Sequence, residues 1–180
     1  MHKPAALPLA QIARGLRQGD FRARDVIEDL LARCEAATPC NAFATIDPAY
    51  ARREADAADA AFAAGHDPGP LAGIPISVKD LLNTRGMRTA WGSRAFADNV
   101  PAADAAAIAA LRDAGAILYA KTTTPEFGHK IVTDSPLHGV TRNPWNLERT
   151  SGGSSGGGAV ATALDLGPVL GHGEQRDDVA

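Results

Sequence analysis

The sequence contains little cysteine and few aromatic residues. Two cysteines, Cys34 and Cys40, occur among 180 residues, and aromatic side chains make up 5% of the chain. The two cysteines do not form a CxxC pair, and no metal-binding spacing surrounds them. We therefore expect neither a disulfide scaffold nor a metal site, and we expect no cofactor.

The chain also lacks a long apolar run and a strong excess of either charge. No window approaches about 18 uninterrupted apolar residues, the length that suggests a membrane-spanning helix. The N-terminal stretch soon becomes charged, which disfavours a secretory signal peptide. The formal net charge is −3, so nothing directs the chain toward nucleic acid or an anionic membrane. We expect a cytoplasmic protein that contacts neither a membrane nor, directly, a nucleic acid.

The order of the apolar residues predicts helices followed by an α/β unit. Helical spacing dominates residues 1–66, and Cys34 falls on the apolar face of one of these helices. The β-branched run at 74–78 predicts a buried strand, the pattern around 101–115 a helix, and "AILYAKT" at 116–122 a second strand. A strand, a helix and a strand with short links are typical of an α/β sheet.

Lys79 is the first candidate for chemistry. It directly follows the apolar run "IPISV", so a strand would end at this residue. Burial there would desolvate the amine, and desolvation disfavours its charged form. A neutral lysine can act as a general base near pH 7. The alternative is a structural lysine that pairs with the adjacent Asp80 at the strand edge.

The glycine-rich stretch "TSGGSSGGGAVATAL", residues 150–164, is the second candidate. Glycine/serine runs are often flexible linkers, but this one is short and leads directly into a helical pattern. Backbone N–H groups at such a junction can hold an anion or an oxyanion. No Gly-Lys-Ser/Thr follows, so it is not a Walker A loop. A dinucleotide-binding loop is also disfavoured, because residues 122–146 are expected to be mostly loop and no strand is expected before the run.

Three separated blocks carry a family resemblance. They read "GIPISVKDLLNTRGMRTAWGS", "AILYAKTTTPEFG" and "NPWNLERTSGGSSGGGAVATA". In this order they closely resemble the amidase signature family, and the resemblance covers roughly residues 8–171. It implies a mixed sheet flanked by helices, with an α-helical N-terminal segment. It also implies hydrolysis of the carbon–nitrogen bond of a small-molecule amide by a Ser–cisSer–Lys triad.

The resemblance assigns roles to individual residues. Lys79 matches the triad lysine, and Ser154 matches the bridging serine, whose preceding peptide bond is cis in the family. A hydroxyl needs an adjacent base to become a good nucleophile, so Lys79 would take a proton through Ser154. Their nitrogen and oxygen should then lie roughly 2.6–3.2 Å apart. Ser155 is expected to give a supporting hydrogen bond, and Gly152 and Gly153 to permit close approach of the backbone.

The resemblance breaks down after the segment "GPVLG". The family places its nucleophilic serine, with the oxyanion-hole amides, roughly two dozen residues after the bridging serine. Here Asp178 lies near that place, and no serine occurs after Ser155. A shifted reading frame or a natural truncation would produce such a tail, and we expect the fragment to be inactive alone. The expected organisation is the N-terminal part of an amidase domain at 1–171 (helical 1–66, α/β core from about 69) and an atypical tail at 172–180.

Two other functions stay open at this point. One is a non-catalytic, amidase-like fragment that acts as a binding or decoy protein. The other is a relative of the glutamyl-tRNA(Gln) amidotransferase A subunit, which would need partner subunits. A sheet cut midway would expose an unpaired edge, so a homodimer is one further expectation. His129, which lies in the second block's loop, is interpreted as part of the loop structure.

Overall fold

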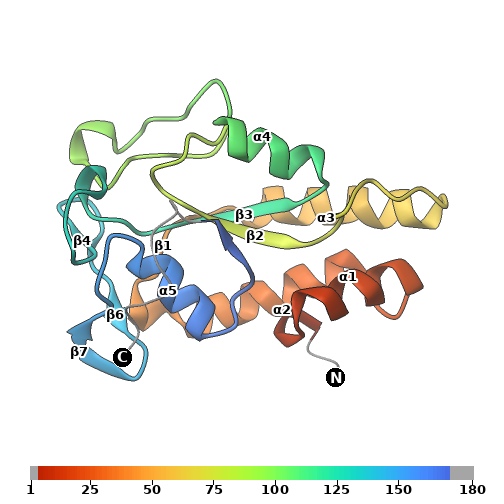
Figure 1. Ribbon diagram of the computed structural model, residues 1–180, viewed down its shortest axis with the longest axis horizontal. Coiled ribbons are helices and arrows are strands. Elements are labelled where there is room, and N and C mark those ends of the chain that lie inside the picture. Colours follow the sequence, from red (N-terminus) through yellow and green to blue (C-terminus); the bar gives the residue numbers. More distant parts are fainter. Residues whose placement is uncertain (1–3, 171–180) are drawn as a thin grey trace.

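The computed structural model describes residues 4–170 and contains a four-stranded sheet in the order β1-β3-β2-β8 (Figure 1). Strands β2 (Pro75–Lys79), β3 (Ile117–Thr122) and β8 (Val169–Leu170) run parallel. Strand β1 (Phe43–Ile46) pairs antiparallel with β3. The expected mixed sheet within an α/β fold is therefore confirmed.

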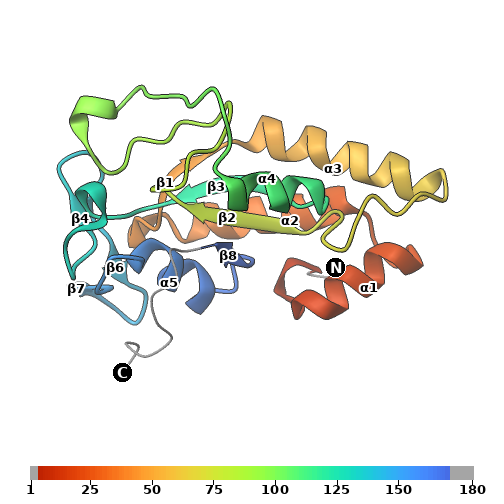
Figure 2. The same cartoon turned by 45° about the horizontal axis from the view of Figure 1, so that its top comes forward.

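Helices cover both faces of this sheet (Figures 1 and 2). Helix α4 (Ala106–Asp113) lies above it in Figure 1, while α1 (Leu9–Gln18), α2 (Ala23–Ala36) and α5 (Gly156–Ala163) lie below. Helix α3 (Pro48–Ala63) packs against α2 and β3. Within residues 4–170, no helix is both long and apolar enough to cross a lipid bilayer.

The main core forms where the sheet meets α1 and α2. Leu16 and Leu30 from these helices are at most 3% exposed and belong to one apolar cluster with Ile74 and Tyr119. The Tyr119 hydroxyl donates a hydrogen bond of 2.5 Å to the carbonyl of Leu166. This bond ties β3 to the segment that leads into β8, so the central strands and the end of the α5 region form one packed unit.

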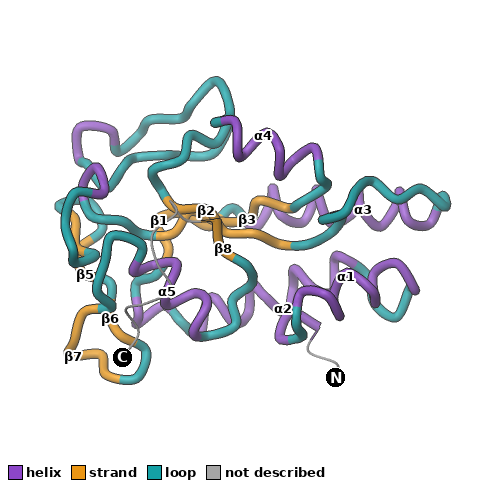
Figure 3. Tube along the Cα trace, viewed as in Figure 1, coloured by secondary structure: helices purple, strands orange, loops and turns teal. Residues whose placement is uncertain are grey.

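Short elements fill the connections, and most gather at one end of the sheet (Figure 3). Two antiparallel hairpins, β4–β5 and β6–β7, lie beside the end of the sheet that holds the carboxyl ends of β2 and β3 (Figure 1). The short elements are η1 (Pro4–Ala6), η2 (Thr38–Cys40), η3 (Arg94–Phe96), η4 (Glu126–Gly128), β4 (Asp134–Ser135), β5 (Gly139–Val140), β6 (Arg142–Asn143) and β7 (Asn146–Thr150).

Two expectations about local structure need correction. Residues 1–66 are not helical throughout, because Phe43–Ile46 forms β1; pairing with β3 stabilises this short strand between two helices. A strand does precede the glycine-rich run, since β7 ends at Thr150. All of β7 is exposed, so no alternation of apolar residues marks it in the sequence. The tail at 172–180, with Asp178, lies outside the described residues.

Candidate active site

Lys79 is the last residue of β2, as the sequence predicted. Its neighbours in the strand are buried, and Lys79 itself is 1% exposed. Because β2 and β3 are parallel, their carboxyl ends meet at one edge of the sheet. Open α/β sheets bind ligands at this edge. The buried lysine therefore lies where such a sheet places its functional groups.

Two serine hydroxyls from the glycine-rich stretch meet the Lys79 amine. Lys79 Nζ donates to Ser154 Oγ at 2.7 Å and to Ser155 Oγ at 2.8 Å. The distance expected between Lys79 and Ser154 is thus confirmed, and the Gly153–Ser154 peptide bond is cis. Both serines are half-buried, so solvent reaches this side of the cluster. We call these three residues the lysine–serine cluster.

Threonines hold the backbone around the lysine–serine cluster. Thr124, which follows β3, donates from Oγ1 to the Ser154 carbonyl at 3.3 Å. The Gly156 amide, at the start of α5, donates to Thr133 Oγ1 at 2.9 Å. This amide is therefore already paired within the protein, although helix-start amides of this kind can hold anions in other proteins.

Close packing accounts for several of the glycines. A Cβ on Gly153 would lie 2.6 Å from the carbonyl carbon of Val132. A Cβ on Gly157 would lie 2.4 Å from Thr123 Oγ1 and 2.5 Å from the Ala42 carbonyl oxygen. Gly152 has room around it, but its φ of +76° is a left-handed conformation that glycine adopts at low cost. The bare backbone thus lets α5 pack directly on the end of β3.

A second buried lysine was missed by the sequence analysis. Lys121 of β3 is fully buried, and its Nζ lies 3.7 Å from Oδ1 of Asp80, which is 1% exposed. Burial raises the pKa of Asp80 to about 6 and lowers the pKa of Lys121 to about 8. The sequence does contain a signal for this pair. Lys121 lies inside the apolar strand "ILYAKT", where a buried charged group needs a partner.

The remaining sequence candidates have structural roles. His129 is exposed, and its Nδ1 lies 2.8 Å from the Glu126 carbonyl oxygen within the same loop. Cys34 is 3% exposed in the core, and burial raises the pKa of its thiol to about 11. Among residues 4–170, no group of three or more histidine, cysteine or carboxylate side chains could hold a metal ion.

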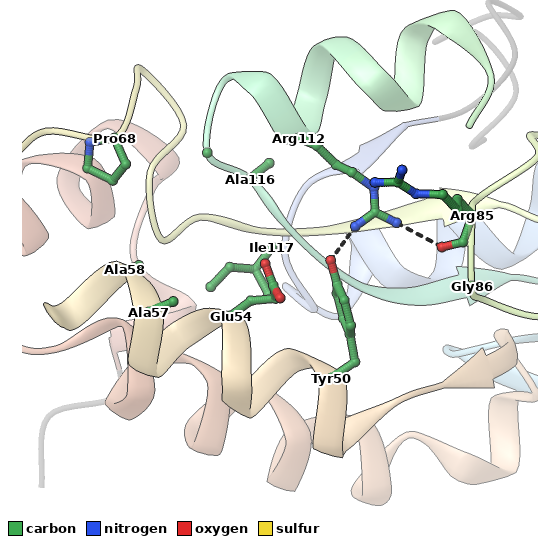
Figure 4. Close-up of a pocket in the computed structure, with 11 residues that line it drawn as sticks. Tyr50, Glu54, Ala57, Ala58, Pro68, Arg85, Gly86, Arg112, Ala116 and Ile117 are labelled. Carbon is green, nitrogen blue, oxygen red and sulfur yellow. Dashed lines mark hydrogen bonds between the residues drawn. The ribbon is translucent and has the colours of Figure 1, made fainter. Parts of the chain in front are cut away.

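A cleft of about 560 Å³ is lined by residues of α3, α4 and β3 (Figure 4), and no residue of the lysine–serine cluster lines it. Ile117, at the amino end of β3, lines it, whereas Lys79 stands at the carboxyl end of the parallel neighbour β2. Arg112 donates to the Tyr50 hydroxyl and, at 3.1 Å, to the Arg85 carbonyl (Figure 4). Arg112 also donates to Asp104 at 3.0 Å. These contacts of Arg112 hold the cleft wall together.

The Lys79 amine contacts two serine hydroxyls at the carboxyl end of a mixed sheet. These features define an α/β protein whose candidate active site is the lysine–serine cluster. The comparison with known families agrees with this class. The chain belongs to the amidase family, whose model matches residues 25–174. Its fold is the amidase signature fold, which solved structures of that family share over about 90% of the chain.

Similar proteins extend well beyond the matched region. The glutamyl-tRNA(Gln) amidotransferase A subunit of Roseiflexus sp. (strain RS-1) is 44% identical over 91% of this chain and 34% of its own length. The peptide amidase from Stenotrophomonas maltophilia has a TM-score of 0.82 at 32% identity, over 88% of this chain and 34% of its own. Fatty acid amide hydrolase has a TM-score of 0.86 at 26% identity, over 91% and 29%. The chain therefore spans about a third of the length of these relatives.

Proposed function

We propose that Lys79 and Ser154 form the proton-transfer part of an active site that hydrolyses amide carbon–nitrogen bonds. The observation that carries this proposal is the 2.7 Å contact between Lys79 Nζ and Ser154 Oγ, in a chain of the amidase family. The 2.8 Å contact with Ser155 supports it, because a second hydroxyl restricts the direction of the amine.

The proposed relay moves two protons, one in each of two linked transfers. Neutral Lys79 accepts the proton of the Ser154 hydroxyl, and Ser154 in turn accepts the proton of a second, nucleophilic serine. That serine attacks the amide carbonyl, and the proton held by Lys79 returns through Ser154 to the departing nitrogen. The acyl–serine bond forms as the carbon–nitrogen bond breaks, and water later releases the acid. At 2.7 Å the Lys79 amine lies within hydrogen-bonding distance of the Ser154 hydroxyl whose proton it would accept.

The nucleophilic serine is the missing member of this relay. The family resemblance expects it near Asp178, and residues 156–180 contain no serine. Loss of one oxyanion donor alone costs about a hundred- to a thousandfold in rate, and loss of the nucleophile removes the covalent route. We therefore propose that these 180 residues do not hydrolyse amides by themselves.

A second candidate function rests on the similarity to the amidotransferase A subunit. The 44% identity to the Roseiflexus protein supports transfer of amide nitrogen as an alternative to simple hydrolysis. Both functions would use the same lysine–serine cluster, since both begin by breaking an amide bond. They differ in the acceptor of the nitrogen, and the amidotransferase function would need partner subunits.

Ammonia release from a panel of aliphatic and aromatic amides tests the proposed inactivity. The chain and its Lys79→Ala and Ser154→Ala variants are measured side by side, with the Stenotrophomonas peptide amidase as a positive control. We expect no release above background from any of the three forms. Turnover by the unmodified chain that both substitutions abolish would show that the cluster supports catalysis without a third serine, and would contradict the proposal.

A further inference from the structure

The buried ion pair between Asp80 and Lys121 lies next to Lys79, the proposed base. Asp80 follows Lys79 in the chain, and its amide continues the ladder of the sheet by donating to the Thr122 carbonyl at 3.1 Å. Adjacent residues of a strand point to opposite faces. Lys79 is in register with Thr122 of β3, so Lys121, the residue before Thr122, points to the opposite face of the sheet from Lys79.

The Lys121 ammonium binds the segment that follows Lys79. Its Nζ donates to the Leu82 carbonyl at 2.5 Å, to Thr84 Oγ1 at 3.1 Å and to Thr89 Oγ1 at 2.9 Å. The other oxygen of the Asp80 carboxylate, Oδ2, accepts from the Ala90 amide at 3.1 Å. One buried charge pair thus fixes both ends of the segment from Leu82 to Ala90.

The same contacts reach the backbone of Lys79. The Leu82 amide donates to the Lys79 carbonyl at 3.0 Å and closes a turn, and the carbonyl of the same Leu82 accepts from Lys121. Movement of this turn would move the Lys79 carbonyl and with it the root of the lysine side chain. Several rotatable bonds separate that root from Nζ, so contacts of 2.7 and 2.8 Å with two serines need a fixed starting point.

We propose that Asp80 and Lys121 are positioning residues, which hold the turn after β2 so that the Lys79 amine stays against both serine hydroxyls. The importance of this positioning for catalysis rests on the proposed role of Lys79 as the base. The claim that the ion pair holds the Lys79 side chain in place does not depend on that role. Burying an ion pair is seldom the most stabilising choice, because desolvation offsets much of the attraction. Apolar residues at both positions would fill the space but would leave the Leu82 carbonyl and the Ala90 amide without these partners.

Lysine-specific NMR can observe the effect, because lysines are few in this chain. In a chain labelled with ¹³C-lysine, a held side chain gives two separate Hε shifts, and a freely rotating one gives a single averaged shift. Lys79→Met assigns the Lys79 signal. The test variant is Asp80→Asn/Lys121→Met, which removes both charges. The matched control is Val26→Ala in α2, which removes core packing and leaves both charges in place.

We expect separate Lys79 Hε shifts in the unmodified chain and in Val26→Ala, and a collapse to one shift in the double variant. If the double variant does not fold, Asp80→Asn decides, since its amide oxygen can still accept from the Ala90 amide. The separation between the two Lys79 Hε shifts should then shrink relative to the unmodified chain. Unchanged Lys79 shifts in a folded charge variant would overturn the positioning proposal. The double variant Ser154→Ala/Ser155→Ala tests the contacts of Lys79 with the serines. If it leaves the Lys79 shifts unchanged, the lysine–serine cluster is contradicted, and the charge variants alone test the positioning proposal.

Discussion

Gly157 and Gly158 offer a matched pair of substitutions in the first turn of α5. Alanine at either position gains about 1 kcal/mol of helix propensity over glycine. A Cβ on Gly157 would lie 2.5 Å from the Thr123 nitrogen and 2.5 Å from the Ala42 carbonyl oxygen, both backbone atoms. A Cβ on Gly158 would lie 2.9 Å from a methyl group of Val169. Backbone cannot rotate away as a side chain can, so the two variants should differ.

Overpacking costs about 1–3 kcal/mol, and the upper end applies where backbone must shift. Subtracting the propensity gain, we expect Gly157→Ala to destabilise by about 2 kcal/mol and Gly158→Ala to be close to neutral. For a chain of this size that is a difference in Tm of about 4–8 °C. Circular dichroism during heating measures it. A Gly157→Ala protein that melts with or above Gly158→Ala would refute the close packing of α5 on β3.

Two further predictions concern acid stability and association. Burial raises the cost of charging His138 and lowers its pKa from 6.5 to about 4, so the folded protein binds fewer protons than the unfolded chain between these values. The stability that neutral His138 contributes is complete above pH 6.5 and is lost as the pH falls toward 4. Between about pH 7 and pH 5, the free energy of unfolding of His138→Gln should therefore fall by about 2 kcal/mol less than that of the unmodified chain. Urea titrations at the two pH values measure this, and equal losses would contradict it. Strand β8 pairs with β2 alone among the described strands, and an unpaired edge favours association. We expect a dimer by size-exclusion chromatography, whereas a monomer that melts cooperatively above about 60 °C would count against it.

The sequence predicted the parts of the site that lie in continuous motifs. Lys79 could be placed at a strand end because an apolar β-branched run precedes it, and Ser154 because its block matches a family pattern. Their 2.7 Å contact joins residues 75 positions apart, and only the family resemblance indicated it. The catalytic roles of both residues stay predictions.

Features that depend on tertiary pairing could not be predicted in the same way. Phe43–Ile46 has too few residues to show an alternating pattern, and it is a strand because β3 supplies its hydrogen bonds. The Asp80–Lys121 pair joins one residue after β2 to another in β3, so its partners are not adjacent in the chain. The glycine run predicted close approach of backbone, but only the structure shows that α5 approaches β3.

The titration of a thiol placed at position 154 tests most directly whether Lys79 and residue 154 share a proton. In a Ser154→Cys protein, the adjacent amine should lower the thiol pKa from about 8.5 to about 7 or below, since neighbouring lysines stabilise a thiolate. Alkylation rates at several pH values, read by mass spectrometry at the peptide that carries the substitution, separate this thiol from the buried Cys34 and Cys40. We expect Lys79→Met to return the thiol pKa to about 8.5 or higher. The same thiol pKa with and without Lys79 would contradict the lysine–serine relay.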